Sequence, residues 1–362
     1  MTAPTTRRPR ICFLTGTLHA MAGAERMAAT IANALAERGF AVSVLSLWDR
    51  SSCFALHAAV KHEALFDQRP SFKRAYAATV AGIRRHVQRL GIDVLIQVDT
   101  MLALFALPAT LGLGVRHIAW EHCHFDEDLG RRTRKLARHL DARYCEHVVV
   151  LTERDRHRWM QATRPRGSVA CIPNPLPFAM PQQPSPRAAK VVVAVGRLVA
   201  AKGFDVLLHA WAVVAQQAPA WKLMIVGEGE ARPALEALRD QLALCDSVEL
   251  PGIYLDITKA YEQASIFCLS SRYEGFGLVL IEAMAYGLPI VSTDCETGPR
   301  ELLADGQTAV VVPVDDATAL AAELSRVISS PQIATRLGAA GREKAAQYSV
   351  EHVTEQWERL LQ

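Results

Sequence analysis

The sequence contains no run of about 18 uninterrupted apolar residues, the length that indicates a membrane-spanning helix, so no transmembrane segment is expected. The first ten residues, MTAPTTRRPR, are polar and basic, and no apolar segment of signal-peptide length follows them. A signal peptide is therefore not expected either. Half of the 362 residues are apolar and 21% are charged, which is typical of a soluble globular protein with two or more domains.

Cysteines with metal-binding or redox spacing are also missing. The eight cysteines include no C-x-x-C motif, and several lie inside apolar stretches, so we expect reduced thiols of a cytoplasmic protein. A disulfide framework and a zinc site are not expected. Aromatic residues make up only 7% of the chain and are few beside its basic segments. Because no nucleic-acid reading motif is present either, nucleic acid is not expected as a partner.

Net charge is small, but it is unevenly distributed. Residues 1–174 contain 25 Lys and Arg against 15 Asp and Glu, a net charge of +10. Residues 175–362 contain 15 against 22, a net charge of −7. A basic first half joined to an acidic second half predicts an anionic partner for the first half.

Short apolar stretches alternate with helical patterns in both halves, which predicts two α/β domains. Strands are expected at residues 11–14, 41–47, 94–98, 115–120, 148–151, 169–172, 190–195, 223–226, 248–252, 264–270, 289–293 and 310–313. Helices are expected at residues 24–38, 72–90, 131–143, 317–329 and 350–361, and residues 51–70 look irregular. The proline-rich residues 175–187 predict a linker between a domain over 1–174 and a domain over 188–345.

The most informative stretch is RYEGFGLVLIEAMAYGLPIVSTDCETGPRE, residues 272–301. Glu274 opens a turn that contains Gly275 and Gly277, and apolar residues at helical spacing follow. The two glycines would let backbone amides come close to a ligand. Because a helix begins there, its free N–H groups predict a phosphate site.

Glu274 and Glu282 are eight residues apart, about two helical turns, so they lie on roughly the same side of the expected helix. Carboxylates do not suit a site for phosphate alone, but they accept strong hydrogen bonds from sugar hydroxyls. A ligand that carries both phosphate and hydroxyl groups therefore fits the pattern. The alternative is a surface helix with solvated glutamates.

Together with EGFG, GLPIV and TGPRE, the spacing resembles the Glu-x7-Glu motif of the retaining nucleotide-sugar glycosyltransferases of the GT-B fold, family 4. The resemblance implies two Rossmann-like doubly wound domains that face each other across a cleft, with a C-terminal helix of about 346–362 packing back on the first. It implies that Glu274, Gly275 and Phe276 meet the donor sugar. Glu282 would meet the ribose, and Gly277 and Leu278 the diphosphate.

Other stretches of the second half resemble the same family. Arg197 and Lys202 match its G-R-L…K-G element, whose two cations clamp the donor diphosphate; two surface cations are the alternative. A diphosphate leaving group develops negative charge, so cations at this place suit the chemistry. By resemblance, the backbone around Ile253 and Tyr254 faces the nucleotide base.

The first half contains candidates for the acceptor side. Gly23 belongs to a GAER sequence that resembles the family's G-G-x-E-R turn, although Ala22 replaces a glycine. His122 resembles the family's acceptor-side histidine near the donor sugar, and Glu121 beside it could hold the ring or face solvent. Asp99, at the carboxyl end of an expected strand, could hold an acceptor or cap a helix.

Residues 131–143 form a strongly basic helical pattern. Its cations recur at helical spacing, and Leu136, Leu140 and Tyr144 form an apolar stripe. Such a helix could lie on an anionic membrane or near a lipid diphosphate, or it could present a solvated face over a core stripe. The cations that would contact the membrane are Arg131, Arg134, Lys135 and Arg138.

The resemblance implies a front-face displacement that retains the anomeric configuration and needs no dedicated base, no cofactor and no metal. Asp126-Glu127-Asp128 is similar to a metal-binding Asp-x-Asp, but it lies far along the chain from the diphosphate elements, so we interpret it as a solvated acidic loop. The sequence of Cys295–Leu302 resembles users of UDP-hexoses and UDP-N-acetylhexosamines.

We therefore expect a metal-independent transferase that moves a hexose or N-acetylhexosamine from a UDP-sugar to a hydroxyl of a glycan. The acceptor is expected to be lipid-linked, in bacterial surface polysaccharide assembly at the inner face of the cytoplasmic membrane. The alternatives are a GDP-mannose-dependent mannosyltransferase, a GT-B epimerase or phosphorylase, and an inactive scaffold that binds sugar nucleotides. The motifs argue against the epimerase, the phosphorylase and the inactive scaffold. Donor hydrolysis would separate a transferase from a scaffold.

Overall fold

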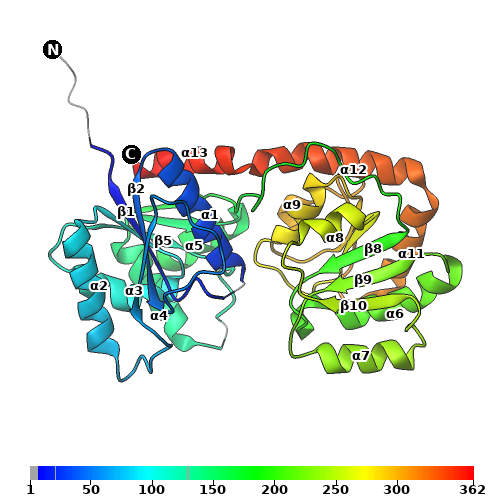
Figure 1. The fold of residues 1–362 in the computed structure, drawn as a ribbon, viewed down its shortest axis with the longest axis horizontal. Coiled ribbons are helices and arrows are strands. Elements are labelled where there is room, and N and C mark those ends of the chain that lie inside the picture. Colours follow the sequence, from blue (N-terminus) through cyan, green and yellow to red (C-terminus); the bar gives the residue numbers. More distant parts are fainter. Residues whose placement is uncertain (1–6, 21, 129) are drawn as a thin grey trace, which may run out of the picture. The chain divides into compact units, whose positions relative to one another are not determined.

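The computed structural model describes residues 7–20, 22–128 and 130–362. The chain divides into two compact units. The first unit is Met1–Pro177 together with Val350–Gln362, and the second unit is Phe178–Ser349. Each unit is a parallel sheet with helices between its strands (Figure 1). Among the described helices, none has the length and hydrophobicity that crossing a bilayer requires.

The first unit has a seven-stranded parallel sheet in the order β3-β2-β1-β4-β5-β6-β7. Its strands are β1 (Arg10–Thr15), β2 (Ala41–Trp48), β3 (Lys61–Phe66), β4 (Val94–Gln97), β5 (Arg116–Trp120), β6 (His147–Val150) and β7 (Ser168–Cys171). Its helices are α1 (Gly23–Glu37), α2 (Tyr76–Leu90), the short η1 (Thr100–Leu102), α3 (Ala103–Thr110), α4 (Arg132–Tyr144), α5 (Glu153–Thr163) and α13 (Val350–Leu361).

The second unit has a six-stranded parallel sheet in the order β10-β9-β8-β11-β12-β13. Its strands are β8 (Val191–Val195), β9 (Lys222–Val226), β10 (Val248–Gly252), β11 (Ile266–Leu269), β12 (Ile290–Thr293) and β13 (Val310–Val312). Its helices are η2 (Ala200–Lys202), α6 (Phe204–Gln217), α7 (Arg232–Gln241), α8 (Thr258–Gln263), α9 (Leu278–Ala285), α10 (Pro299–Leu302), α11 (Ala317–Ser329), α12 (Pro331–Ala345) and η3 (Ala346–Tyr348). In Figure 1, α8 and α9 lie on one side of this sheet and α6 and α7 on the other.

The fold class expected from the sequence, two doubly wound Rossmann-like units, is confirmed. Strands such as β4, β11 and β12 are buried along their whole length because helices cover both faces of each sheet. The expectation that residues 51–70 are irregular is wrong, since β3 lies within them and pairs with β2. β3 is an edge strand that is only partly buried, so its sequence KHEALF carries no continuous apolar run.

In each sheet the strand order reverses at one place, between β1 and β4 in the first unit and between β8 and β11 in the second. Loops that leave the carboxyl ends of the two strands at such a switch point diverge to opposite faces of the sheet. The gap between them is where open α/β sheets bind ligands. Residues 197–203 and 270–277, which the sequence marks as site candidates, follow β8 and β11 and so lie at the second unit's switch point.

The last helix, α13, belongs to the first unit although it is distant in sequence from the rest of that unit. Trp357 is fully buried, and its ring meets the Trp120 ring of β5 edge-on at 4.8 Å between centroids. Arg38 Nη1 after α1 lies 2.7 Å from Glu358 Oε2. Hydrophobic burial and this ion pair hold the end of the chain against the first sheet.

Asp141 on α4 is a buried carboxyl among polar groups of the first unit. Its side chain is fully buried; Oδ1 accepts a hydrogen bond of 3.3 Å from Cys145 Sγ, and Oδ2 has no partner within the described part of the chain. Burial raises the pKa of Asp141 well above its ordinary value, and the negative charge of Glu121 adds to the rise. Folding therefore favours the protonated form of Asp141.

This protonation predicts that Asp141→Asn stabilises the first unit at pH 8. The unfolded carboxyl releases its proton above about pH 4, whereas the raised pKa makes the folded carboxyl hold its proton to higher pH, so folding loses free energy as pH rises. An amide cannot ionise, so the gain should shrink as pH falls toward about 4. Urea unfolding of both proteins at several pH values measures the difference. Asp126→Asn is the control of opposite sign, because Arg158 lowers the pKa of that carboxyl. A variant that is less stable than the wild type at pH 8, by the same amount at every pH, would contradict the protonated state.

Candidate functional site

The two loops at the second unit's switch point pack backbone against backbone. Gly203 follows η2 with a φ of +60°, and a Cβ built on it would lie 2.1 Å from the carbonyl oxygen of Ser270, which follows β11. Ser270 Oγ donates to the carbonyl oxygen of Lys202 at 2.9 Å. Only glycine allows this conformation and this approach. Gly203 therefore fixes the backbone position of the preceding Lys202.

An ion pair joins these loops. Lys202 Nζ lies 2.6 Å from Glu274 Oε1, and Ser271 Oγ donates to the same oxygen at 2.7 Å. Glu274 is 7% exposed, while the Lys202 side chain passes over Gly196 and is 21% exposed. Among the described residues, Glu274 Oε2 accepts no hydrogen bond, so the carboxylate is oriented through one oxygen only.

Arg197 and Arg272 play different parts around this pair. Arg197 is exposed, and its guanidinium makes no hydrogen bond or ion pair with any described residue. Arg272 Nη2 and Nε instead lie 2.7 Å from Asp205 Oδ2 and Asp315 Oδ1, respectively, and Nη1 donates to the carbonyl oxygen of Ala200. Arg272 therefore clamps the Lys202 loop to the Glu274 loop. The sequence analysis missed this role, because nothing in the spacing links residues 205, 272 and 315.

Backbone amides at the start of α9 complete the group. Gly277 is the N-cap of α9 with a φ of +85°. Within the described chain, neither its amide nor that of Leu278 donates a backbone hydrogen bond. A Cβ on Gly298 would lie 2.5 Å from the Phe276 carbonyl oxygen, and Thr297 Oγ1 donates to the Glu274 carbonyl oxygen. The turn at residues 297–298 therefore packs against the loop that precedes α9. A fixed helix start with free amides suits an anion.

Glu282 lies in the second turn of the same helix and is 2% exposed. Its Oε2 accepts a 2.7 Å hydrogen bond from the hydroxyl of Tyr261 on α8. Phe276 is also buried, with its ring edge-on to Tyr348 at 6.1 Å. Glu274 and Glu282 thus lie on one short helix and its preceding turn, as the sequence predicted, but Glu282 is far more enclosed than a solvated helix residue.

Ile253 and Tyr254 lie farther along the sheet, in the loop after the edge strand β10. Ile253 is 53% exposed, and the Tyr254 hydroxyl contacts Met224 Sδ at 3.6 Å. Within the described chain, neither residue hydrogen-bonds Glu274 or Glu282. The structure therefore leaves their assignment to a nucleotide base as a prediction.

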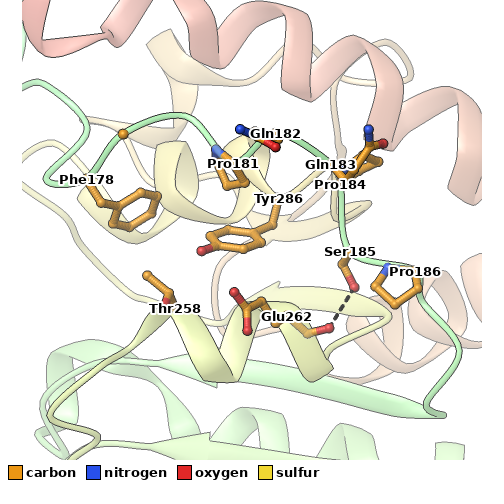
Figure 2. Close-up of a pocket in the computed structure, with 11 residues that line it drawn as sticks. Phe178, Pro181, Gln182, Gln183, Pro184, Ser185, Pro186, Thr258, Glu262 and Tyr286 are labelled. Atoms are coloured by element: carbon orange, nitrogen blue, oxygen red, sulfur yellow. Dashed lines mark hydrogen bonds between the residues drawn. The ribbon is translucent and has the colours of Figure 1, made fainter.

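A hollow of about 410 Å³ lies within the second unit, where residues 178–186 cross α8 (Figure 2). Tyr286 stands between linker residues such as Phe178 and the α8 residues Thr258 and Glu262. Ser185 Oγ donates to the carbonyl oxygens of Glu262 at 3.1 Å and Ala264 at 2.7 Å. None of the sequence-predicted site residues lines this hollow.

In the first unit, His122 follows β5 and its ring packs on Trp120, with 4.5 Å between centroids. Burial lowers the pKa of His122 to about 4. The imidazole is therefore neutral at physiological pH, and its Nε2 has no partner in the part of the chain that the structure describes. In a neutral imidazole, such a nitrogen can donate or accept one hydrogen bond, depending on the tautomer.

Asp99 lies just after β4, and Gly23 lies at the start of α1. Asp99 is the N-cap of η1, where Oδ1 accepts from Met101 N at 2.7 Å, and Oδ2 lies 2.9 Å from Arg134 Nη2. The helix-capping alternative for Asp99 is therefore confirmed. Gly23 is the first residue of α1.

The assignment of Arg134 and Arg138 to a membrane surface is wrong. Both side chains are nearly fully buried, and they hold Glu121 between them: Arg134 Nη1 lies 3.2 Å from Oε1 and Arg138 Nε 2.9 Å from Oε2. Burial works against their charge, but Asp99 and Glu121 outweigh it and raise the pKa of Arg134. Glu121 thus neither holds the His122 ring nor faces solvent.

Helical spacing alone could not show which face of α4 is buried. The basic residues at 134 and 138 form one stripe and the apolar residues at 136, 140 and 144 another, and apolar stripes usually face the core. Here Glu121 draws the basic stripe inward, and Arg138 also donates to the carbonyl oxygens of His124 and Glu127. Leu136 and Tyr144 are left 55% and 61% exposed, beside Arg131 and Lys135, which are exposed as expected.

Comparison with known proteins agrees with this architecture. A family model described as Glycosyl transferases group 1 matches residues 177–344, and one described as Glycosyltransferase Family 4 matches residues 21–179. An uncharacterized glycosyltransferase of Haemophilus influenzae is 32% identical over 97% of this chain and 99% of its own length.

Two further proteins are similar over nearly their whole length. The GalNAc-α-(1→4)-GalNAc-α-(1→3)-diNAcBac-PP-undecaprenol α-1,4-N-acetyl-D-galactosaminyltransferase of Campylobacter jejuni is 25% identical over 97% of this chain and 98% of its own. The crystal structure of Anabaena HepE in complex with UDP-glucose superimposes with a TM-score of 0.81 at 21% identity, covering 98% of this chain and 99% of that one. From the matched families, the full-length relative and the two doubly wound units, the chain belongs to the group 1 glycosyltransferases of the GT-B fold, family 4 type.

Proposed function

We propose that this glycosyltransferase moves a hexose or N-acetylhexosamine, with retention of configuration, from UDP to a hydroxyl of a lipid-linked glycan in bacterial polysaccharide assembly. The observation that carries the proposal is the Lys202–Glu274 ion pair beside the free amides of α9, at the second unit's switch point. It places a cation, a carboxylate and an anion-binding helix start within one loop pair. The cation and the helix start suit a diphosphate, and the carboxylate suits the hydroxyls of a sugar.

On donor binding, Lys202 and Arg197 would neutralise the diphosphate, together with the amides of Gly277 and Leu278. Lys202 is paired with Glu274, so a phosphate oxygen competes for its amine. Glu274 would then accept hydrogen bonds from hydroxyls of the sugar, next to Gly275 and Phe276. Glu282 would accept from the ribose, and the backbone around Ile253 and Tyr254 would face the base.

In the transfer step, the bond between the anomeric carbon and the diphosphate oxygen breaks, and the acceptor oxygen bonds to the same face of that carbon. The departing diphosphate oxygen takes the proton of the acceptor hydroxyl, so no side chain serves as base. Arg197, Lys202 and the α9 amides stabilise the charge that develops on the leaving group. Metal independence is part of this proposal, since these groups supply the positive charge.

The choice of UDP over GDP rests on two supports. The sequence of Cys295–Leu302 resembles users of UDP-sugars, and HepE, a protein of the same fold, was crystallised with UDP-glucose. The lipid-linked acceptor is favoured by the Campylobacter jejuni relative, whose name states an undecaprenyl diphosphate glycan. We assign acceptor recognition to the first unit, with neutral His122 and the Gly23 turn as its candidates. Asp99 would act there by positioning Arg134.

A lipid-linked acceptor implies a membrane contact, and we assign it to the outer face of α4 in place of the buried Arg134 and Arg138. The outer α4 face consists of Arg132, Lys135, Leu136, Leu140 and Tyr144. Its two exposed apolar side chains, Leu136 and Tyr144, alternate with exposed cations, and Arg143 stacks over the Tyr144 ring at 5.8 Å. An amphipathic face of this kind fits an anionic bilayer, into which the apolar side chains insert while the cations meet lipid headgroups.

Titration calorimetry with UDP and with GDP tests the donor site. Wild type should bind UDP, and Lys202→Ala should weaken UDP binding about tenfold or more, because one charge-assisted contact to phosphate is lost. Lys222→Ala, at the opposite end of the sheet where β9 begins, should leave binding unchanged. Binding of GDP alone would move the donor to GDP-mannose or a related sugar. Binding of neither nucleotide would refute the transferase function.

Glu274→Gln separates donor binding from catalysis. The amide keeps the shape of the side chain, so UDP affinity should change little, whereas sugar transfer and donor hydrolysis should fall about 100-fold or more. Release of UDP from a panel of UDP-sugars measures the rate. Unchanged turnover in this variant would contradict the role of Glu274 at the donor sugar.

Flotation with lipid vesicles tests the outer α4 face. The double variant Leu136→Glu/Tyr144→Glu should reduce binding to vesicles with about 30% anionic lipid by roughly tenfold, since both apolar insertion and charge attraction are weakened. Val213→Glu, an exposed apolar position on α6 of the second unit, is the matched control. Equal binding by the double variant and the control would rule out this face as the membrane contact.

A further inference from the structure

The hydroxyl of Tyr261 makes a buried hydrogen bond to Glu282. It donates to Glu282 Oε2 at 2.7 Å, and the two side chains are 0% and 2% exposed. Tyr261 comes from α8 and Glu282 from α9, so the bond joins two helices on the same side of the sheet. A phenol that donates to a carboxylate away from water forms a strong, directional hydrogen bond.

The Tyr261 ring cannot turn away from Glu282. It stacks on Tyr286 with 5.7 Å between centroids and an interplanar angle of 26°, and it meets Phe267 of β11 at 6.1 Å. Tyr286 in turn is backed by Phe178 at 5.8 Å, and Ser185 ties the same linker to the end of α8 (Figure 2). The position of the hydroxyl is therefore set by packed rings and not by local chain flexibility.

A glutamate that binds a ribose must present its carboxylate in one plane. The side chain has three rotatable torsions, so ordering it at the moment of binding costs conformational entropy. A fixed donor on one oxygen removes that freedom in advance, as partners of ligand-binding groups do in other sites. Glu282 also lies on the helix whose first amides are assigned to the diphosphate. Its orientation therefore sets the separation of the ribose and diphosphate subsites.

We propose that Tyr261 is a positioning residue that orients Glu282 for the ribose hydroxyls of the donor nucleotide. The proposal rests on the donor site proposed above. A purely structural Tyr261 would support α8 and the core of the second unit without any preference for ribose. The two roles differ in one measurable respect, which is how strongly the protein distinguishes a nucleotide with ribose hydroxyls from one without them.

The experiment compares UDP with 2′,3′-dideoxy-UDP by calorimetry. The proteins are wild type, Tyr261→Phe, Tyr286→Phe, Glu282→Gln and the double variant Tyr261→Phe/Glu282→Gln. Tyr286→Phe is the matched control, since it removes a hydroxyl from the neighbouring ring of the same stack. If wild type binds GDP and not UDP, GDP is compared with 2′,3′-dideoxy-GDP in the same way.

Tyr261→Phe should lower affinity for UDP about fivefold to tenfold and affinity for dideoxy-UDP less than twofold. Tyr286→Phe should change neither, and adding Tyr261→Phe to Glu282→Gln should have no further effect. Equal losses for UDP and dideoxy-UDP would show a structural role and overturn the proposal, as would unchanged binding in Tyr261→Phe. Both of these results would leave the proposed donor site standing, provided that wild type binds UDP more tightly than dideoxy-UDP. Failure of wild type to bind any nucleotide would overturn both.

Discussion

The ion pair between Lys202 and Glu274 is the constraint on which the second unit's site depends. It closes the gap between the loops after β8 and β11, and it exists only because Gly203 lets one loop touch the Ser270 backbone while Arg272 clamps both. The pair keeps a nearly buried carboxylate from standing without a counter-charge. In the proposed donor complex, a phosphate oxygen would replace the Glu274 carboxylate as the partner of Lys202.

A second charge cluster organises the first unit. Glu121, held by Arg134 and Arg138, fixes the loop after β5 that contains His122, and Arg138 binds three carbonyl oxygens of residues 124–127. Loss of one partner would leave a buried charge uncompensated, which costs several kcal/mol in proteins. The same cluster turns α4 so that its apolar stripe faces outward. One buried glutamate thus determines both the setting of His122 and the chemistry of an exposed surface.

The sequence predicted most strands because buried parallel strands are continuous apolar runs. It offered candidates for the donor site because each lies in a short motif, and their roles stay predictions. It failed where contacts depend on distant partners. β3 has no apolar run, the burial of Arg134 required Glu121 thirteen residues earlier, and Arg272 finds Asp205 and Asp315 only in the folded unit. Tyr261 carries no signal beside Glu282, because twenty-one residues and a strand separate them.

The most direct test of the account is a crystal structure of the protein with UDP. The account predicts that Lys202 Nζ leaves Glu274 Oε1 for a phosphate oxygen, that the diphosphate receives the amides of Gly277 and Leu278, and that Glu282 keeps its bond to Tyr261 while it meets the ribose. A structure in which UDP binds elsewhere, with the 2.6 Å pair between Lys202 and Glu274 intact, would contradict it.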